Sequence, residues 1–369
     1  MKKLTQAQAE ALRYTRASAA PLQTRAQESI AEICARAGVS AEEGIGILSG
    51  IGRRARVTLN FHPDRLLPEG ISVAEGMLRS GRYRSQFETR VTNGSRTAYP
   101  GGDRDRWERQ LFGGAYHAPD AGGDSRPKYG ALHLLRHADG AAPRFGSCYV
   151  ILRPEVSDRC TFTLGDSHLG PEHVGTRDTL LPLLAALLRR IEADRAALGV
   201  APLDPGAFLE LLRAASTERL NPGAGPVGRA LDDYIEAQVH GEIDLASDVE
   251  ALVADPSYRG TDTGAALADM AARYGFGLRW HAGFRLETAR VPDDFRGPAM
   301  PPFARRVDLV AAAPGWLDAA AIGRAAASAF REPERWQDWA PPDETFQHFK
   351  QLWHVLVRFG HSVGQDGGS

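Results

Sequence analysis

Two short stretches of the sequence place chemically capable side chains in a row. In ARVTLNFH every second residue is apolar, so Arg56 and His62 share the opposite side of an expected strand. YIEAQVHG alternates in the same way and brings Glu236 and Gln238 to one side. Guanidinium, imidazole, carboxylate and amide groups can bind a polar ligand, transfer protons and stabilise developing charge. The two rows predict either a cleft lined from both strands or a sheet with one face in water.

Hydroxyl and carboxyl groups between these two strands extend the same set. RPKYGALHLL contains Tyr129, and CTFTLGDSH contains Thr163, Asp166 and Ser167. We expect these side chains to add hydrogen bonds around the cavity that the two rows would line.

A long polar segment, residues 83–125, is rich in Arg, Asp and Gly and contains Tyr99, Trp107 and Tyr116. We expect no regular structure in it. It is either a solvated loop whose charges neutralise one another or a surface that anchors an acceptor or a phosphate-bearing ligand. Its candidate acceptor-binding residues are Gln86, Asn93, Asp103 and Arg104.

Potential metal ligands gather in GDSHLGPEH, which contains Asp166, His168, Glu172 and His173. Their spacing fits no strong metal-binding template, and the Gly and Pro residues suit a loop. We therefore expect no metal, and a metal-assisted hydrolase built on this segment is an alternative. GAGPVG, at residues 223–228, has the letters of a dinucleotide fingerprint, but it follows no strand and contains a proline, so we expect a loop.

The order of the expected elements favours an α+β fold with a mixed sheet. We expect three short helices in residues 1–54, a central α+β domain with a cleft in residues 55–290, and a mostly helical extension in residues 291–369. The pattern of ASDVEALVAD predicts a short helix, and that of RVDLVA predicts a strand.

Composition narrows the class of protein. The 369 residues include 44 Lys and Arg against 46 Asp and Glu, which argues against a general nucleic-acid binder. The longest apolar stretch, residues 180–188, is too short to span a bilayer, and the N-terminal residues lack the apolar run of a signal peptide. Three scattered cysteines predict neither a disulfide framework nor a cysteine zinc site. We expect a cytoplasmic protein with no membrane partner.

Several motifs together resemble an uncharacterised bacterial family, a domain of unknown function that would span nearly the whole chain. They are ARVTLNFHPDR, YRSQFETRVTNG, AYPGGDRDRWE, RPKYGALHLL, FGSCYVILRPEV, CTFTLGDS and YIEAQVHGEI. More remotely, their order is similar to that of ADP-ribosyltransferase-like toxin and phage-associated domains. This second resemblance implies a mixed sheet of the ADP-ribosyltransferase type, flanked here by N- and C-terminal helical segments.

The remote resemblance also implies roles for individual residues around NAD. The implied catalytic residues are Glu236, Gln238, His62 and Glu242. The implied cofactor-binding residues are Arg56, Arg65, Tyr129, Thr163, Asp166 and Ser167. Such families often place the catalytic Glu last in a Gln-x-Glu or Glu-x-Glu pair. This chain has Glu236 first and Gln238 last, which makes Glu242 a rival carboxylate.

The implied reaction consumes NAD as a substrate. Cleavage of the nicotinamide–ribose bond develops positive charge on the ribose, and a carboxylate near the anomeric carbon stabilises that charge. The chain would then be an ADP-ribosyltransferase or an NAD glycohydrolase, with a protein, a nucleic acid, a small molecule or water as the acceptor. A non-enzymatic binding protein that uses the N-terminal helices and the polar segment is a further alternative.

Overall fold

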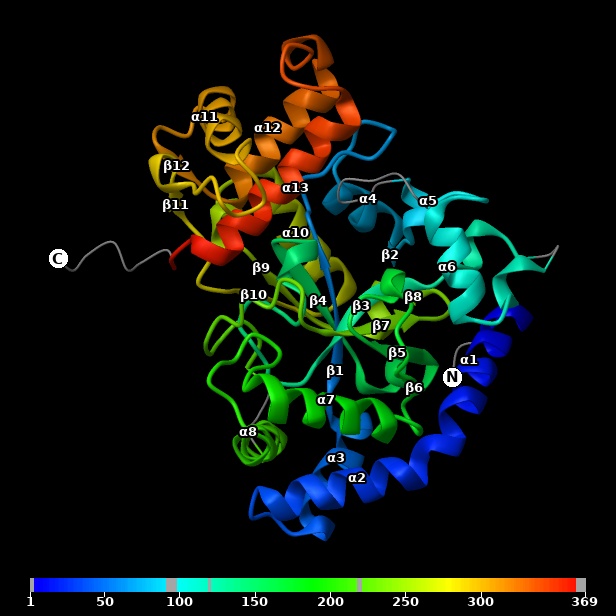
Figure 1. Ribbon diagram of the computed structural model, residues 1–369. Coiled ribbons are helices and arrows are strands. Elements are labelled where there is room, and N and C mark those ends of the chain that lie inside the picture. The colour runs from blue at the N-terminus through cyan, green and yellow to red at the C-terminus, as the bar shows by residue number, and fades with distance from the viewer. Residues whose placement is uncertain (1–2, 91–97, 119–120, 218–220, 363–369) are drawn as a thin grey trace.

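An eight-stranded mixed sheet forms the centre of the molecule, with the strand order β10-β9-β4-β1-β3-β7-β5-β6. A computed structural model describes residues 3–90, 98–118, 121–217 and 221–362 (Figure 1). β9 and β10 pair in parallel, and the other neighbours in this sheet pair antiparallel. The strands are β1 (Arg56–Phe61), β3 (Lys128–His133), β4 (Cys148–Leu152), β5 (Cys160–Leu164), β6 (Val174–Thr176), β7 (Ile235–Val239), β9 (Val249–Ala254) and β10 (Gly277–Trp280). Two small antiparallel pairs lie outside this sheet, namely β2 (Arg82–Tyr83) with β8 (Ile243–Asp244) and β11 (Leu286–Glu287) with β12 (Trp316–Leu317).

Helices precede, interrupt and follow the strands, as an α+β fold requires. The α-helices are α1 (Gln6–Ala19), α2 (Gln23–Arg36), α3 (Ala41–Arg54), α4 (Val73–Ser80), α5 (Gln86–Thr89), α6 (Asp103–Leu111), α7 (Leu181–Asp194), α8 (Pro205–Thr217), α9 (Leu245–Asp248), α10 (Asp262–Tyr274), α11 (Met300–Ala311), α12 (Ala319–Arg331) and α13 (Pro342–Phe359). The 3₁₀ turns are η1 (Ala20–Leu22), η2 (Ala115–His117), η3 (Gly123–Ser125), η4 (Pro143–Phe145), η5 (Pro154–Arg159), η6 (Ser167–Leu169), η7 (Pro256–Tyr258), η8 (Thr288–Arg290) and η9 (Pro333–Arg335). The α+β class, the mixed sheet and both helical ends are confirmed, whereas the ADP-ribosyltransferase type of the sheet stays a prediction.

The three expected N-terminal helices are present, and side-chain caps explain where two of them begin. Thr5 and Gln8 form a capping box at the start of α1. Ser40 accepts a hydrogen bond from the backbone N–H of Glu43 at 3.1 Å and starts α3. In Figure 1, α2 and α3 lie together with α7 on one side of the sheet, and α2 packs against both.

The apolar rows of β1 and β7 face one continuous core. Val57 and Leu59 of β1 and Ile235 and Ala237 of β7 belong to the same cluster of buried apolar residues. That cluster extends from the N-terminal helices through the sheet to α11, α12 and α13. The C-terminal helices therefore share the core of the sheet, and the domain boundaries expected after residues 54 and 290 stay predictions.

The opposite, polar rows are buried too. Thr58 and Asn60 of β1 and Glu236 and Gln238 of β7 are each less than a tenth exposed. Helix α6 lies over this side, because its Glu108 accepts a hydrogen bond from the hydroxyl of Tyr129 in β3 at 2.7 Å. The polar side of the sheet is thus not an open, solvated face.

Two expectations about single elements were wrong. ASDVEALVAD is helical only at its start, where α9 ends at Asp248, and Val249–Ala254 then forms β9 between β4 and β10. A strand with neighbours on both edges and apolar residues on both faces has no clear period of two, which explains the error.

RVDLVA is not a strand, because it forms the end of helix α11. Val307 is buried and Leu309 is 82% exposed, although strand alternation would place the two side chains on one face. Val307 instead shares a buried helical face with Phe303 and Ala311. The fragment was too short for its period to be determined.

The polar segment at residues 83–125 was expected to lack regular structure, and this was also wrong. It contains β2, α5, α6 and two 3₁₀ turns. DRDRWERQL lacks the apolar periodicity that would predict a helix. The reason is that the side of α6 that faces the sheet carries the buried acids Asp105 and Glu108 in place of apolar residues.

We predict that Ile235→Asp prevents stable folding. The Ile235 side chain is fully buried in the main core, and an unpaired carboxylate there has no compensating partner. Ile235→Val removes one methylene group and is expected to cost only about 1 kcal/mol. Circular dichroism and urea unfolding measure both, and a cooperative native-like transition for Ile235→Asp would contradict the assignment of this row to the core.

Candidate functional site

A cleft of about 380 Å³ opens on the polar side of the sheet. The neighbouring strands β1, β3 and β7 contribute Asn60, Tyr129 and Glu236 to its lining, and α6 contributes Arg104 and Trp107. The sheet register explains this convergence, because antiparallel partners project on the same side. The cleft is therefore built where the sheet's polar rows meet the covering segment.

Glu236 is the most deeply buried carboxylate of the cleft lining, with 4% of its surface exposed. Its Oε1 accepts a hydrogen bond from Nε2 of Gln238 at 2.8 Å. Burial and, to a smaller extent, the nearby charge of Asp166 raise the pKa of Glu236 to about 7, against opposing effects of Ser167, Gln238 and Arg104. Such a carboxyl group exchanges its proton near neutral pH, which suits catalytic chemistry.

Gln238 lies behind Glu236 and holds it in place. The Gln238 amide oxygen accepts a hydrogen bond from the Thr161 hydroxyl at 2.8 Å, and Nε2 also donates to Thr163 at 3.3 Å. These partners fix the orientation of the amide, so that its N–H group points to Glu236. Glu236, the first of the two in the sequence, therefore borders the cleft, and Gln238 is a fully buried support behind it.

Asp166 lines the same cleft as Glu236, and its pKa is shifted in the opposite direction. Its carboxylate accepts hydrogen bonds from the hydroxyl of Tyr234 at 2.9 Å and contacts Nδ1 of His168 at 2.7 Å. Although burial raises the pKa of Asp166, the contacts with His168 and Tyr234 outweigh it and hold that pKa below its usual value. The cleft thus combines an ionised Asp166 with a Glu236 that titrates near neutrality.

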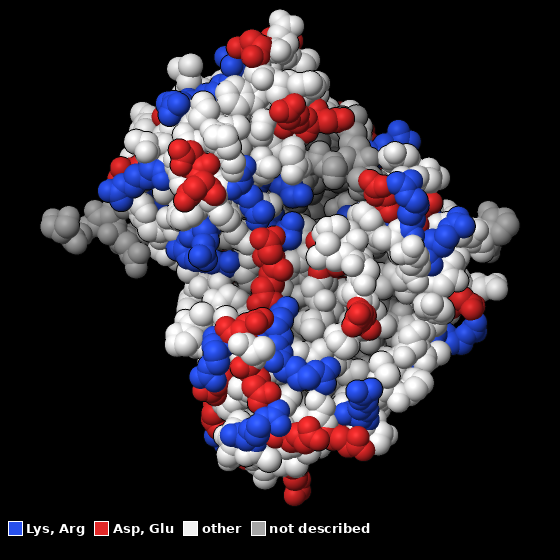
Figure 2. Space-filling model, viewed as in Figure 1, with Lys and Arg blue, Asp and Glu red and all other residues white. Residues whose placement is uncertain are grey.

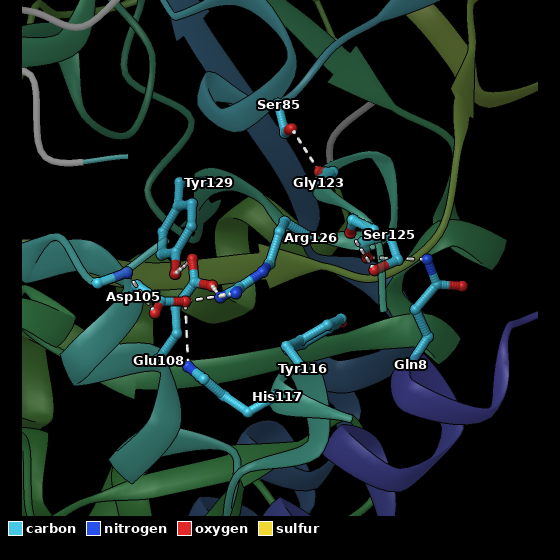
Figure 3. Close-up of polar contacts among 12 residues, drawn as sticks. Gln8, Ser85, Asp105, Glu108, Tyr116, His117, Gly123, Ser125, Arg126 and Tyr129 are labelled. Carbon is cyan, nitrogen blue, oxygen red and sulfur yellow. Dashed lines mark hydrogen bonds and ion pairs between the residues drawn. The ribbon is translucent and has the colours of Figure 1, made fainter. Parts of the chain in front are cut away.

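A buried ionic cluster fastens α6 to the sheet beneath the cleft (Figure 3). Arg126 donates a hydrogen bond to Glu108 at 2.6 Å and also binds Asp105. The Tyr129 hydroxyl donates to the other oxygen of Glu108, and Nε2 of His117 lies 3.0 Å from Asp105. Burial raises the pKa of Glu108 despite the opposing effects of Arg126 and Tyr129. This cluster positions both the Tyr129 ring and helix α6 at the cleft.

Arg104 projects from α6 between two aromatic rings of the cleft. Its guanidinium carbon lies 4.4 Å from the centre of the Tyr129 ring and 4.8 Å from that of the Trp107 ring. Stacking of this kind fixes a guanidinium while leaving its N–H groups available to a ligand.

The cleft carries positive charge that its own carboxylates do not neutralise. Arg84, Arg104 and Lys350 line it, and none of their side chains forms an ion pair or hydrogen bond within the described ranges of the chain. Of the lining acids, Asp103 pairs with Arg106, and Asp166 is bound to His168. An anionic ligand would supply the missing countercharge. Elsewhere on the face shown in Figure 2, Lys and Arg alternate with Asp and Glu and form no extended patch of one sign.

The structure brings many of the expected site residues together. Six of them line the cleft, namely Gln86, Asp103, Arg104, Tyr129, Asp166 and Glu236. Thr163 and Ser167 lie beside Glu236, where Thr163 contacts Gln238 and Ser167 affects the Glu236 pKa. The cofactor-binding and acceptor-binding roles of these residues stay predictions.

His62 and Arg65 lie in an adjoining hollow of about 100 Å³, which shares Asn60 and Gln86 with the cleft. The His62 ring packs edge-on against Trp353 of α13 at 5.1 Å. Burial and the nearby charge of Arg65 lower the pKa of His62 well below its usual value, so the ring is neutral at pH 7.

Other expected residues lie elsewhere. Arg56 forms a 2.6 Å ion pair with Glu250, and neither residue lines the cleft. Glu242 is half-exposed and pairs with Arg82 at 2.8 Å, also away from the cleft lining. The structure therefore separates Glu242 from Glu236, and Asn93 lies outside the described residues.

The potential metal ligands of GDSHLGPEH do not form a set. Asp166 and His168 contact each other, but no group of three or more His, Cys, Asp or Glu side chains suited to a metal occurs in the described parts of the chain. GAGPVG is a loop, as expected, and the buried Asp139 accepts hydrogen bonds from the backbone N–H groups of Gly228 and Arg229 at 2.7 and 2.8 Å.

Several residues of this site were not among the site residues expected from the sequence. They include Glu108, Arg144 and Lys350. One signal was present for Lys350, because the chain has only four lysines and both internal ones, Lys128 and Lys350, line this cleft. Nearly all other cations of the chain are Arg, and a Lys differs from Arg in its compact ammonium group, so the two internal Lys residues were candidates for a specific binding role.

The fold and the cleft define an α+β protein with a buried carboxylate beside an unneutralised cationic wall. The chain belongs to the family described as "Protein of unknown function (DUF3626)", which matches residues 56–359, from β1 to the end of α13. It is also similar to the "Gene 2 protein" of Mycobacterium phage D29, with 36% identity over 102 residues. That similarity covers 27% of this chain and 34% of the phage protein. In the part of the chain that the structure describes, no helix combines the length and apolar character needed to cross a membrane.

We predict that Arg126→Met strongly destabilises the protein. The change leaves Asp105 and Glu108 buried without their cation, which typically costs about 3–5 kcal/mol. Tyr129→Phe removes one hydrogen bond from the same cluster and is expected to cost about 1–3 kcal/mol. Urea unfolding measures both free energies, and an Arg126→Met protein as stable as Tyr129→Phe would show that the cluster does not hold α6.

We predict that Glu236→Gln stabilises the protein above neutral pH. Glu236 keeps its proton up to a pH of about 7 when folded but only to about 4.5 when unfolded, so stability from this group is complete below pH 4.5 and is lost as the pH rises to 7. Each pH unit in this window costs at most about 1.4 kcal/mol, or about 3 kcal/mol in all. A neutral amide avoids the loss.

The measurement is the melting temperature of Glu236→Gln and of the wild type between pH 5 and pH 8. The difference in favour of the variant should grow with pH, whereas the half-exposed Glu242→Gln should show no such trend. A constant difference across this range would mean that Glu236 is not held in a raised-pKa environment.

Proposed function

We propose that this protein cleaves the nicotinamide–ribose bond of NAD and transfers the ADP-ribosyl group to an acceptor or to water. The observation that carries the proposal is the Glu236 carboxyl group, which is buried at the edge of a cleft where the cations Arg84, Arg104 and Lys350 form no ion pair in the described chain. NAD combines a diphosphate, which those cations can bind, with a ribose that needs a carboxylate at its reacting carbon.

Glu236 acts in its ionised form. The bond between the nicotinamide nitrogen and the ribose C1′ breaks, and its electron pair leaves with nicotinamide, which departs as a neutral molecule. Positive charge then develops on the ribose, and the adjacent Glu236 carboxylate stabilises it more strongly in the transition state than in the ground state. A nucleophilic oxygen or nitrogen of the acceptor bonds to C1′, and its proton is released to solvent.

The support for Glu236 over Glu242 is geometric. Glu236 faces the cleft and is oriented by Gln238, whereas Glu242 is half-exposed and occupied by Arg82. Preorganised charge in a site shielded from water is worth far more than the same charge at the surface.

Cationic and aromatic groups support binding of the remainder of NAD. Arg84 and Arg104 have guanidinium groups free to contact a diphosphate, and the Trp107 ring offers a stacking surface next to them. Neutral His62 in the adjoining hollow is suited to hydrogen bonding with ribose hydroxyls. This mode of binding needs no metal.

We predict that Glu236→Gln lowers turnover roughly 100-fold or more, the scale of one lost transition-state electrostatic contact. The affinity for NAD should change little, because the amide keeps the shape of the carboxyl group. In the wild type, turnover should rise with pH through about 7 as Glu236 ionises. Release of nicotinamide, measured by liquid chromatography, and the melting temperature with NAD provide the two readouts.

The matched control is Glu242→Gln, which is expected to keep wild-type turnover. Full activity of Glu236→Gln would refute the proposed carboxylate, and full activity of both variants would refute the mechanism. If millimolar NAD raises the melting temperature but no nicotinamide is released with any candidate acceptor, the non-enzymatic binding alternative is favoured.

A further inference from the structure

A second cationic wall closes the cleft on the side of the C-terminal helices. Lys350 of α13 and Arg144 of η4 both line the cleft together with Asp166 and Glu236. Arg104 and Trp107 belong to α6, a separate element. The cleft therefore has basic groups from two parts of the chain that are far apart in the sequence.

The charges on this second wall are incompletely balanced. Arg144 shares Asp232 with Arg296, at 2.7 and 2.9 Å, and its own contact with Asp166 is a longer 4.0 Å. The Lys350 side chain forms no ion pair or hydrogen bond with the described residues. Three cations, Arg144, Arg296 and Lys350, are therefore near one another. Among the described contacts, Asp232 is the one carboxylate that forms an ion pair shorter than 3 Å with any of them.

The effects on neighbouring groups support this excess of positive charge. Burial lowers the pKa of Lys350, and the charges of Arg144 and Arg296 lower it further, against the opposing effects of Asp166 and Asp232. Burial, followed by Arg296, Arg144 and Lys350, lowers the pKa of the nearby His354 to about 2. Burial is the largest cause of both shifts, and the neighbouring cations add to it in the same direction.

We propose that Lys350 and Arg144 form a phosphate-binding subsite at the C-terminal wall of the cleft. The proposal deepens the proposed function, because a phosphate group held here would lie beside Asp166 and Glu236. The Nε of Arg144 is buried without a hydrogen-bond partner, and the Lys350 ammonium group has three N–H donors. Both groups can donate hydrogen bonds to the oxygens of a phosphate. The phosphate belongs either to NAD itself or to a second, phosphate-bearing molecule that serves as the acceptor.

The test is direct binding of inorganic diphosphate to the full chain, measured by isothermal titration calorimetry. Lys350→Gln should weaken binding about tenfold or more, the scale of one charge-assisted hydrogen bond. The control is Arg358→Gln, which removes an exposed cation from the same helix and should leave the dissociation constant unchanged. The melting temperature of Lys350→Gln should not fall, because Lys350 forms no stabilising pair in the described structure.

A competition experiment identifies the source of the phosphate. If NAD displaces diphosphate from the wild type, the subsite holds the diphosphate of NAD. If both bind together, and Lys350→Gln weakens only the binding of diphosphate, the subsite belongs to a phosphate-bearing acceptor.

Two results would overturn the subsite. They are an absence of diphosphate binding by the wild type at millimolar concentration and an equal affinity of Lys350→Gln and Arg358→Gln. The outcome is separable from that of the proposed function, because it needs no turnover. Loss of diphosphate binding in Lys350→Gln, together with full nicotinamide release by both Glu236→Gln and Glu242→Gln, would keep the subsite and reject the NAD mechanism.

Discussion

The burial of Arg126 between two carboxylates is the constraint on which the rest of the site depends. Glu108 and Asp105 lie on the side of α6 that faces the sheet, where a charged group is costly unless it is paired. The guanidinium of Arg126 pairs with both, and Tyr129 satisfies the remaining oxygen of Glu108. A polar helix can therefore cover a polar sheet face and bring Arg104 and Trp107 to the edge of the cleft.

Two buried carboxyl groups on the polar side of the sheet, Glu108 of α6 and Glu236 of β7, have different surroundings. Glu108 has a direct cationic partner, whereas Glu236 is hydrogen-bonded to the Gln238 amide, forms no ion pair in the described contacts and lies near the charge of Asp166. Burial raises the pKa of both groups, so the ionised form of each is less favourable in the folded state, but the ion pair with Arg126 offsets part of that cost for Glu108. The negative charge of Glu236 is unfavourable in the folded protein without ligand, and positive charge that develops nearby in a transition state would stabilise it. Such an arrangement is suited to catalysis.

The C-terminal helices complete the cleft and are part of the family match. The match ends at residue 359, the last residue of α13, and includes Lys350 and Trp353. Helix α13 packs Trp353 against His62 and hydrogen-bonds the carbonyl of Pro143 at 2.7 Å, next to Arg144. The segment expected to be a helical extension thus forms one wall of the site.

Local patterns in the sequence determined the alternation of β1 and β7, the capped N-terminal helices and the common orientation of Glu236 and Gln238. Such patterns describe a residue relative to its own element and carry no information on what covers it. Whether Glu236 or Glu242 is buried, and whether Lys350 reaches the cleft, was decided by tertiary contacts with α6, α13 and Arg82. Burial and countercharge, which set the chemistry of a carboxyl group, arise between segments that are distant in the chain, so only the folded structure determined the site.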